Sequence, residues 1–479
     1  MNGWYACGSS TTSTNSYMND EHFECAEFEV PLCHDGVCTS DKTIAVFVKR
    51  LAAKAPTAHH KPRKALYLLQ GGPGYSSEAM EYSMLTYSRL SDGAIDLYTV
   101  DHRGTGRSNF LECKAAQAFN SGSPDGKEVT LEEMPECLKD VLFHIDDHTE
   151  AFSVTSAAKD LALVINALHP DPKKSHVFVG GASYGTFLVQ RLMHFAPPAV
   201  RGYVLDGVDT EMPANSTSPS DVCHWNHAIL EPSKVLLQYC YDDPSCPLKF
   251  DGERDDVLDE VMRLYAKLDN NAEKNACAKW LLKSGSESEE TPSDVLRGIL
   301  AGWVGDVSAR ERVPLFLSLL KRCTKHDLRE AKRYVSSSHW RRLTSARPAP
   351  RATRRLVDIL NPVEDESPIL FNLITFSERW ESSDMSLNAQ QRMFRAGPFS
   401  TPWTTEMEMY CLYTSNSDEN CRDFDVPTGP HFVYDKDKYY GAPLHLADNQ
   451  SVLLVNGKLD FNTPSAFAKA CYDKIEGGD

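Results

Sequence analysis

The segment Gly-Ala-Ser-Tyr-Gly at 181–185 has the spacing of a serine nucleophile on a tight turn. An apolar run, His176–Gly180, precedes it, and a helical pattern, Tyr184–Phe195, follows it. A strand-to-helix turn has room for only small residues on either side of the serine, and glycine fills both positions. The helix dipole and the first free N–H groups of the helix favour a negative charge that develops there. The pattern predicts that Ser183 is the nucleophile of an acyl-transfer reaction and not part of a plain Gly/Ser turn. The residues expected to support this turn are Gly181 and Gly185.

A second motif, Gly71-Gly72-Pro73-Gly74, directly follows the apolar run Leu66–Gln70. Glycines let the backbone come close to a reacting group, so a strand that ends in such a loop can present N–H groups to an oxyanion. We expect the N–H groups of Gly72 and Tyr184 to form this oxyanion hole, with Gly71, Pro73 and Gly74 supporting the loop.

A third motif, Asp101–Ser108, is a glycine-rich loop that follows the apolar run Leu97–Val100. The loop lacks the lysine of a P-loop and the glycine spacing of a dinucleotide-binding fold, so it does not predict a phosphate site. We expect Asp101 and Arg103 to hold loops together beneath the active site.

These three motifs, together with the segment Leu453–Pro464, resemble the prolyl iminopeptidase and tripeptidyl aminopeptidase family of α/β-hydrolases. The resemblance covers most of residues 22–210 and 405–475. It implies the α/β-hydrolase fold, a serine-type aminopeptidase activity, and Asp460 as the acid of the catalytic triad. Many relatives have histidine where this chain has Gln70. We expect this difference to affect the support of the loop more than the backbone N–H groups of the oxyanion hole.

The resemblance also implies a base histidine that follows Asp460 on a later loop. No histidine follows His445 in this sequence, which ends at Asp479. The expectation is therefore that the base is not in this chain, that the chain is truncated before its final strand and histidine, and that it is poorly active. We expect His102, His431 and His445 to be surface or structural residues that do not replace the base.

Short β-branched and aromatic runs, each followed by a glycine-rich turn or a helical pattern, predict an α/β fold with a mostly parallel sheet. The predicted strands are Ile44–Arg50, Ala65–Gln70, Asp96–Asp101, His176–Gly180, Gly202–Leu205 and Ser451–Val455. Predicted helices of this part are Ser156–Leu168, capped by Thr155 or Ser156, Tyr184–Phe195 and Pro464–Ile475.

The alternation of strand and helix stops near residue 208 and returns near residue 450. We therefore predict an α/β core made of residues 22–207 and 396–479, and a mainly helical lid made of residues 208–395. In the lid, the apolar residues have helical spacing at Val257–Leu268, Ser293–Val304 and Val313–Leu320. The basic run Ser337–Arg355 is interpreted as a solvated loop.

The chain has 479 residues and a net charge of −17, which disfavours nucleic acid as a partner, and it has no apolar run of transmembrane length. Its 14 cysteines include pairs with spacings typical of local disulfides. These pairs are Cys33/Cys38, Cys240/Cys246 and Cys411/Cys421. With sequons at Asn215 and Asn449, they predict a secreted or lysosome-like location, although no signal peptide is visible.

No metal site or cofactor is predicted. The cysteine spacings are not those of zinc sites, the segment His144–His148 is interpreted as a solvated acidic turn, and His224 and His227 lack a third ligand. The predicted function is an exopeptidase that releases amino acids or tripeptides from peptides with a free N-terminus. An esterase or lipase of the same fold, and a non-catalytic binding protein without the base, remain open, as does the oligomeric state.

Overall fold

The computed structural model describes ten ranges of the chain. They are residues 1–8, 22–54, 61–113, 129–211, 224–270, 272–285, 290–336, 366–380, 386–402 and 404–476. The predicted loop Ser337–Arg355 and the sequon at Asn215 lie outside these ranges, whereas Asn449 is described and exposed.

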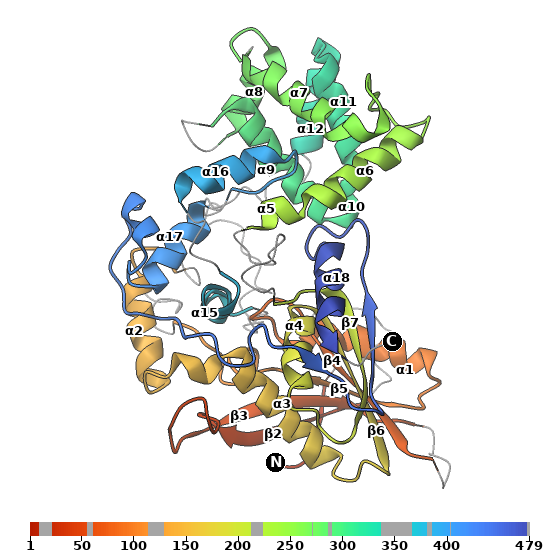
Figure 1. Ribbon diagram of the computed structural model, residues 1–479, viewed down its shortest axis with the longest axis vertical. Coiled ribbons are helices and arrows are strands. Elements are labelled where there is room, and N and C mark those ends of the chain that lie inside the picture. Colours follow the sequence, from red (N-terminus) through yellow and green to blue (C-terminus); the bar gives the residue numbers. More distant parts are fainter. Residues whose placement is uncertain are drawn as a thin grey trace.

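An eight-stranded sheet forms the lower half of the molecule in Figure 1. Its strands, in spatial order, are β1 (Tyr5–Cys7), β2 (Phe23–Pro31), β3 (Thr43–Leu51), β5 (Asp96–Val100), β4 (Arg63–Leu69), β6 (Ser175–Ser183), β7 (Val200–Val208) and β9 (Ser451–Val455). The pairs from β1 to β5 are antiparallel, and those from β5 to β9 are parallel. The parallel strands therefore bring their carboxyl ends to one edge, where α/β proteins build their sites.

All six predicted strands are present. Runs such as Ala65–Leu69 are almost continuously buried, which is typical of parallel strands covered on both faces. The sequence did not reveal β1 and β2, nor a small second sheet in which β8 (Leu444–His445) pairs with β10 (Ile475–Glu476).

Helices cover both faces of the large sheet. Along β4, Tyr67 and Leu69 point into the main core with α3 (Val154–Leu168) and α4 (Tyr184–Met193), whereas Leu68 points to the opposite face with α1 (Glu81–Leu90). Further helices of this half are α2 (Met134–His144), α15 (Pro368–Glu378), α17 (Thr404–Tyr413) and α18 (Ser465–Lys474).

Helix α3 starts two residues earlier than predicted. Its N-cap is Ser153, whose side chain accepts a hydrogen bond from the Ser156 N–H, so Thr155 and Ser156 are helical residues and not caps.

A separate group of helices, called here the helical segment, lies above the sheet (Figure 1). It consists of α5 (Trp225–Ala228), α6 (Leu230–Asp242), α7 (Val257–Asn270), α8 (Ala276–Ser284), α9 (Pro292–Gly305), α10 (Val307–Arg310), α11 (Arg312–Arg322), α12 (Lys325–Ser336) and α16 (Leu387–Ala396). It has its own apolar core, in which Leu264, Trp303 and Phe316 are buried. The helices predicted at α7, α9 and α11 are present.

Helix α15 differs in its packing from the rest of the predicted lid range, 208–395. Its side chains Leu370, Leu373 and Ile374 are buried in the core of the sheet, and not in that of the helical segment. The apolar pattern of a helix does not specify which of two cores it joins, so this packing could not be predicted from the sequence.

Six disulfides are formed by the described residues, and the three predicted local pairs are among them. The other three are Cys7–Cys25, Cys113–Cys137 and Cys277–Cys323. Cys471 is buried as a free thiol, and Cys223 lies outside the described ranges.

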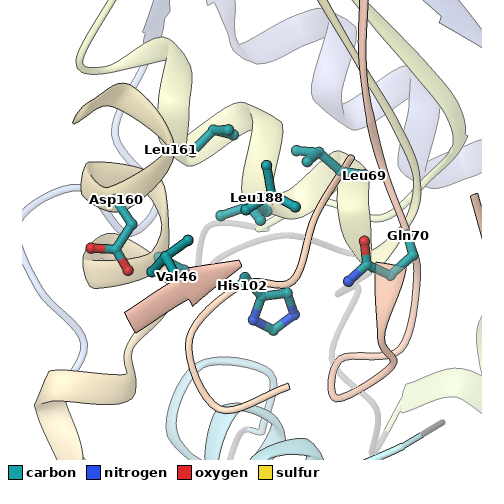
Figure 2. A pocket seen from close by; sticks show the side chains of 9 residues that line it. Val46, Leu69, Gln70, His102, Asp160, Leu161 and Leu188 are labelled. Carbon is teal, nitrogen blue, oxygen red and sulfur yellow. The ribbon is translucent and has the colours of Figure 1, made fainter. Parts of the chain in front are cut away.

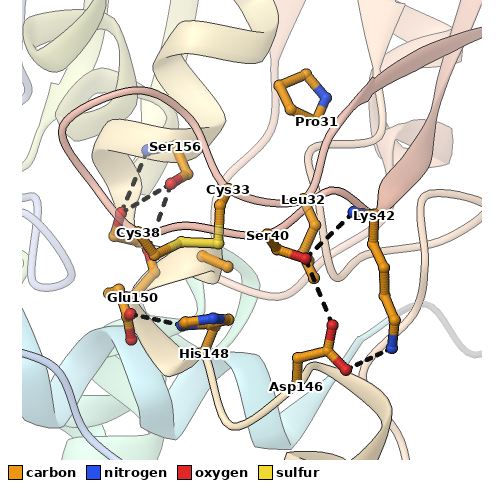
Figure 3. Close-up of a disulfide and its surroundings, with 12 residues drawn as sticks. Pro31, Leu32, Cys33, Cys38, Ser40, Lys42, Asp146, His148, Glu150 and Ser156 are labelled. Carbon is orange, nitrogen blue, oxygen red and sulfur yellow. Dashed lines mark hydrogen bonds and ion pairs between the residues drawn. A yellow bond between two sulfur atoms is a disulfide. The ribbon is translucent and has the colours of Figure 1, made fainter.

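Figure 3 shows the Cys33–Cys38 disulfide, which closes the turn between β2 and β3. His148 lies beside it but pairs with Glu150 at 2.9 Å, while the neighbouring Asp146 pairs with Lys42. Because sulfurs joined in a disulfide are not thiolates, these cysteines and His148 do not provide metal ligands while the bond is intact. Within the described ranges, no helix is both long and apolar enough to cross a lipid bilayer.

Candidate active site

Ser183 is the last residue of β6, and α4 begins at the next residue. Its backbone has φ 53° and ψ −127°, a strained conformation for a residue with a side chain. The pairing of β6 with β7 shifts register at the same point, between Ala182 and Ser183. The strand therefore turns sharply and presents Ser183 at the carboxyl edge of the sheet, where Tyr184 supplies one of the first free N–H groups of α4.

Both flanking glycines lie where no larger residue fits. A Cβ atom on Gly181 would lie 2.3 Å from the Gly185 carbonyl oxygen. One on Gly185 would lie 2.6 Å from the Leu69 carbonyl oxygen and 2.7 Å from that of Gln70. Contacts this short are forbidden, so glycine is required at both positions.

The predicted oxyanion loop lies directly against Ser183. A Cβ atom on Gly71 would be 3.1 Å from Ser183 Cβ and 3.4 Å from Ser183 Oγ. The loop is held at both ends: Gln70 Nε2 donates a hydrogen bond of 2.7 Å to the Tyr75 carbonyl, and Ser367 N donates one of 2.9 Å to the Gly74 carbonyl.

Gly72 and Gly74 have φ values of 119° and 101°, which only glycine adopts readily. The support from Ser367, just before α15, was not predictable because almost 300 residues of sequence separate it from the loop.

Asp460 lies in a turn between β9 and α18, and its carboxylate is held by its own turn. Oδ1 accepts hydrogen bonds from the N–H groups of Asn462, at 2.9 Å, and Thr463, at 2.8 Å. Oδ2 accepts one from Thr463 Oγ1 at 2.8 Å. A Cβ atom on Gly207 of β7 would lie 3.4 Å from Asp460 Oδ2 and 4.0 Å from Ser183 N. The structure thus brings Asp460 and Ser183 together on either side of Gly207.

Asn456 fastens this turn to the sheet, a role that the sequence did not reveal. Its Oδ1 accepts from Val208 N at 2.7 Å, and its Nδ2 donates to the Thr463 carbonyl at 2.8 Å.

No histidine in the described ranges forms a hydrogen bond with Ser183 or Asp460. His102 is buried, and its Nδ1 lies 3.3 Å from the carbonyl oxygen of Arg103. It lines a cavity of about 10 Å³ together with Gln70 and Asp160 (Figure 2). Burial lowers the pKa of His102 to about 4, so the ring is neutral at pH 7. His431 and His445 are exposed.

Arg103 and Asp101 tie loops together beneath this edge. Arg103 is fully buried and binds both carboxylate oxygens of Asp160, at 2.7 and 2.6 Å, as well as the carbonyls of Pro31, Leu32 and Ala151. Asp101 accepts hydrogen bonds from Ser77 N at 2.6 Å and Arg107 N at 2.8 Å, which ties the glycine-rich loop to the segment that follows the Gly71 loop.

Two buried clusters of charged side chains lie along α4, the first of them beside Thr186. Asp209 pairs with Arg379 at 2.7 Å, and Thr186 Oγ1 links the backbone of Asp209 to the Ser183 carbonyl. Burial raises the pKa of Asp209, against the opposing charge of Arg379. Its Oδ1 has no hydrogen-bond partner among the described residues.

One and a half turns further along α4, Arg191 binds both Glu211 and Glu378. These five charged residues come from distant parts of the chain, so no sequence motif marks them.

Several solved structures are similar to this chain. The peroxisomal alpha-beta-hydrolase Lpx1 from Saccharomyces cerevisiae is 14% identical, covers 44% of this chain and 52% of its own, and has a TM-score of 0.28. The epoxide hydrolase VrEH1 from Vigna radiata is 12% identical, covers 94% of this chain and 87% of its own, and has a TM-score of 0.30.

The chain spans about half the length of the first of these structures. No protein-family model matches the sequence, and no curated protein matches it either. The order and direction of the strands, with the sharp turn at Ser183 between β6 and α4, identify the architecture as the α/β-hydrolase fold.

Proposed function

We propose that this protein is a serine hydrolase that works through an acyl-enzyme. The observation that carries the proposal is the strained backbone of Ser183, held between two obligatory glycines with the Gly71 loop against its side chain. Strain of this kind persists where the surrounding structure enforces it, and it is concentrated at functional sites.

In the proposed reaction, Ser183 Oγ attacks the substrate carbonyl and gives its proton to an imidazole. Asp460 orients that imidazole and stabilises its positive charge. The N–H groups of Gly72 and Tyr184 bind the oxyanion, at roughly 3–4 kcal/mol for each donor. The imidazolium then protonates the leaving group, and water hydrolyses the ester on Ser183 by the same steps. Because no histidine in the described ranges reaches Ser183, imidazole is supplied in the assays below.

We further propose that the substrate is a peptide with a free N-terminus, from which amino acids or tripeptides are released. The net charge of −17 favours cationic ligands. Asp209, whose backbone is linked to the Ser183 carbonyl through the Thr186 hydroxyl, has a carboxylate oxygen without a partner among the described residues. The six disulfides agree with the proposed secreted or lysosome-like location.

The test compares aminoacyl and tripeptidyl aryl amides with their N-acetylated forms and with short acyl esters. The proposal expects turnover of the free amides, a fall of at least about tenfold in kcat/KM on N-acetylation, and loss of turnover in Ser183→Ala. Equal turnover with and without acetylation would contradict the exopeptidase. Turnover of the esters alone would indicate an esterase of the same fold.

A further inference from the structure

The helical segment contacts the proposed acid turn, Asp460–Thr463, directly. Phe461 is buried in the core of the helical segment, and Trp225 Nε1 donates a hydrogen bond of 3.2 Å to the Phe461 carbonyl. At the end of α9, a Cβ atom on Gly305 would be 3.6 Å from Asn462 Oδ1. The short helix α10 follows immediately and, in Figure 1, lies above α18, which begins after this turn.

Arg310, the last residue of α10, is brought against this turn. Its Nε donates to the Val304 carbonyl at 2.8 Å, and the guanidinium carbon lies 5.2 Å from the centre of the Phe461 ring. These two contacts fix the plane of the guanidinium but use neither of its terminal NH₂ groups.

The two carboxylates whose charges act on Arg310, those of Asp460 and Asp306, do not accept hydrogen bonds from its terminal NH₂ groups. Burial lowers the pKa of the partly buried guanidinium, and the negative charges of Asp460 and Asp306 oppose that shift. Both Asp460 oxygens are already bound within their own turn, and Asp306 Oδ1 accepts from Ser308. Neither terminal nitrogen of Arg310 donates to a residue in the described ranges.

We infer that Arg310 binds a carboxylate of the substrate, and that the enzyme acts on short peptides whose C-terminal carboxylate is free. The inference rests on the proposed hydrolase function. Two parallel N–H donors of a fixed guanidinium suit a carboxylate in bidentate geometry. The positive charge also offsets the repulsion that Asp460 exerts on an incoming anion.

The experiment uses pairs of short peptides that differ only in a free or amidated C-terminus, assayed with imidazole present. The wild type is expected to prefer the free carboxylate by at least about tenfold in kcat/KM. Arg310→Gln loses this preference, so that its kcat/KM values for the two peptides differ by less than about twofold. Arg310→Lys keeps part of it, because lysine retains the charge but not the fork of donors. Arg312→Gln, which removes a charge two residues further on, is the matched control and keeps the full preference.

Two outcomes overturn the inference: a wild type indifferent to the C-terminus, or an Arg310→Gln variant that slows both peptides equally. The second result would mean that Arg310 acts on the Asp460 turn and not on the substrate.

Calorimetric binding of the two peptides to Ser183→Ala separates this inference from the proposed function. Tighter binding of the carboxylate form, lost in the Ser183→Ala/Arg310→Gln double variant, supports the Arg310 site even when no peptide is hydrolysed. Turnover that is unchanged in Ser183→Ala would count against the hydrolase proposal alone.

Discussion

The close packing around Ser183 makes Gly185 a sensitive position at the residue scale. A methyl group there would collide with two carbonyl oxygens, at 2.6 and 2.7 Å, and these belong to the backbone that leads into the Gly71 loop. We predict that Gly185→Ala lowers the free energy of unfolding by roughly 1–3 kcal/mol and displaces the loop.

Gly298 of α9 is the matched control, because nothing lies within 4 Å of a Cβ atom at that position. Gly298→Ala should stabilise the protein by about 0.5–1 kcal/mol, since alanine favours the helix. Urea unfolding of the two variants measures both effects. A Gly185→Ala variant as stable as Gly298→Ala would show that the turn has room for a side chain.

Residues marked by a contiguous motif could be predicted, and residues assembled by the fold could not. Ser183 lies in such a motif, and the segment that contains Asp460 resembles a known one. In the structure both residues adjoin Gly207, and their catalytic roles stay predictions. Gly207, Asn456 and Asp209 carry no signal of their own, because their positions depend on the pairing of β7 with β9 and on the packing of α15.

At the scale of elements, Arg103 connects the end of β2, the turn before α3, and α3 itself. Removing its charge leaves Asp160 buried with His34 as its remaining ionic partner. We predict that Arg103→Met lowers the free energy of unfolding by about 3–5 kcal/mol, the usual cost of breaking a buried ion pair.

The control for this prediction is Lys42→Met, which breaks the largely exposed pair with Asp146. It should cost less than about 1 kcal/mol, because water screens exposed charges. Similar losses in the two variants, measured by urea unfolding, would contradict the structural role assigned to Arg103.

Elements with a simple apolar pattern were predictable, including β3 to β7 and β9. Strand β2 was missed because it is interrupted by glutamates, two of which are exposed on its solvent-facing side. Helix α15 was assigned to the lid because its pattern shows that it is buried but does not show against which core.

For the whole molecule, buried neutral histidines make stability depend on pH. Burial lowers the pKa of both His102 and His169 to about 4, whereas an unfolded histidine titrates near 6.5. Between these values the unfolded chain binds more protons, so stability is full above pH 6.5 and is lost as the pH falls toward 4. For His102 the shift corresponds to about 3 kcal/mol.

We predict that His102→Gln loses less stability than the wild type between pH 7 and pH 4.5, since glutamine does not titrate. His144→Gln, at an exposed position on α2, should follow the wild type. Urea midpoints at the two pH values provide the measurement. Parallel curves for the wild type and His102→Gln would show that His102 is not buried in its neutral form.

The most direct test of the account is covalent labelling with a fluorophosphonate, followed by mass spectrometry of the proteolytic peptides. The probe should add to the peptide that contains Ser183, imidazole should accelerate the reaction, and Ser183→Ala should remain unlabelled. A label on another serine, equal labelling of Ser183→Ala, or an unlabelled wild type even with imidazole would contradict the assignment of Ser183 as the nucleophile.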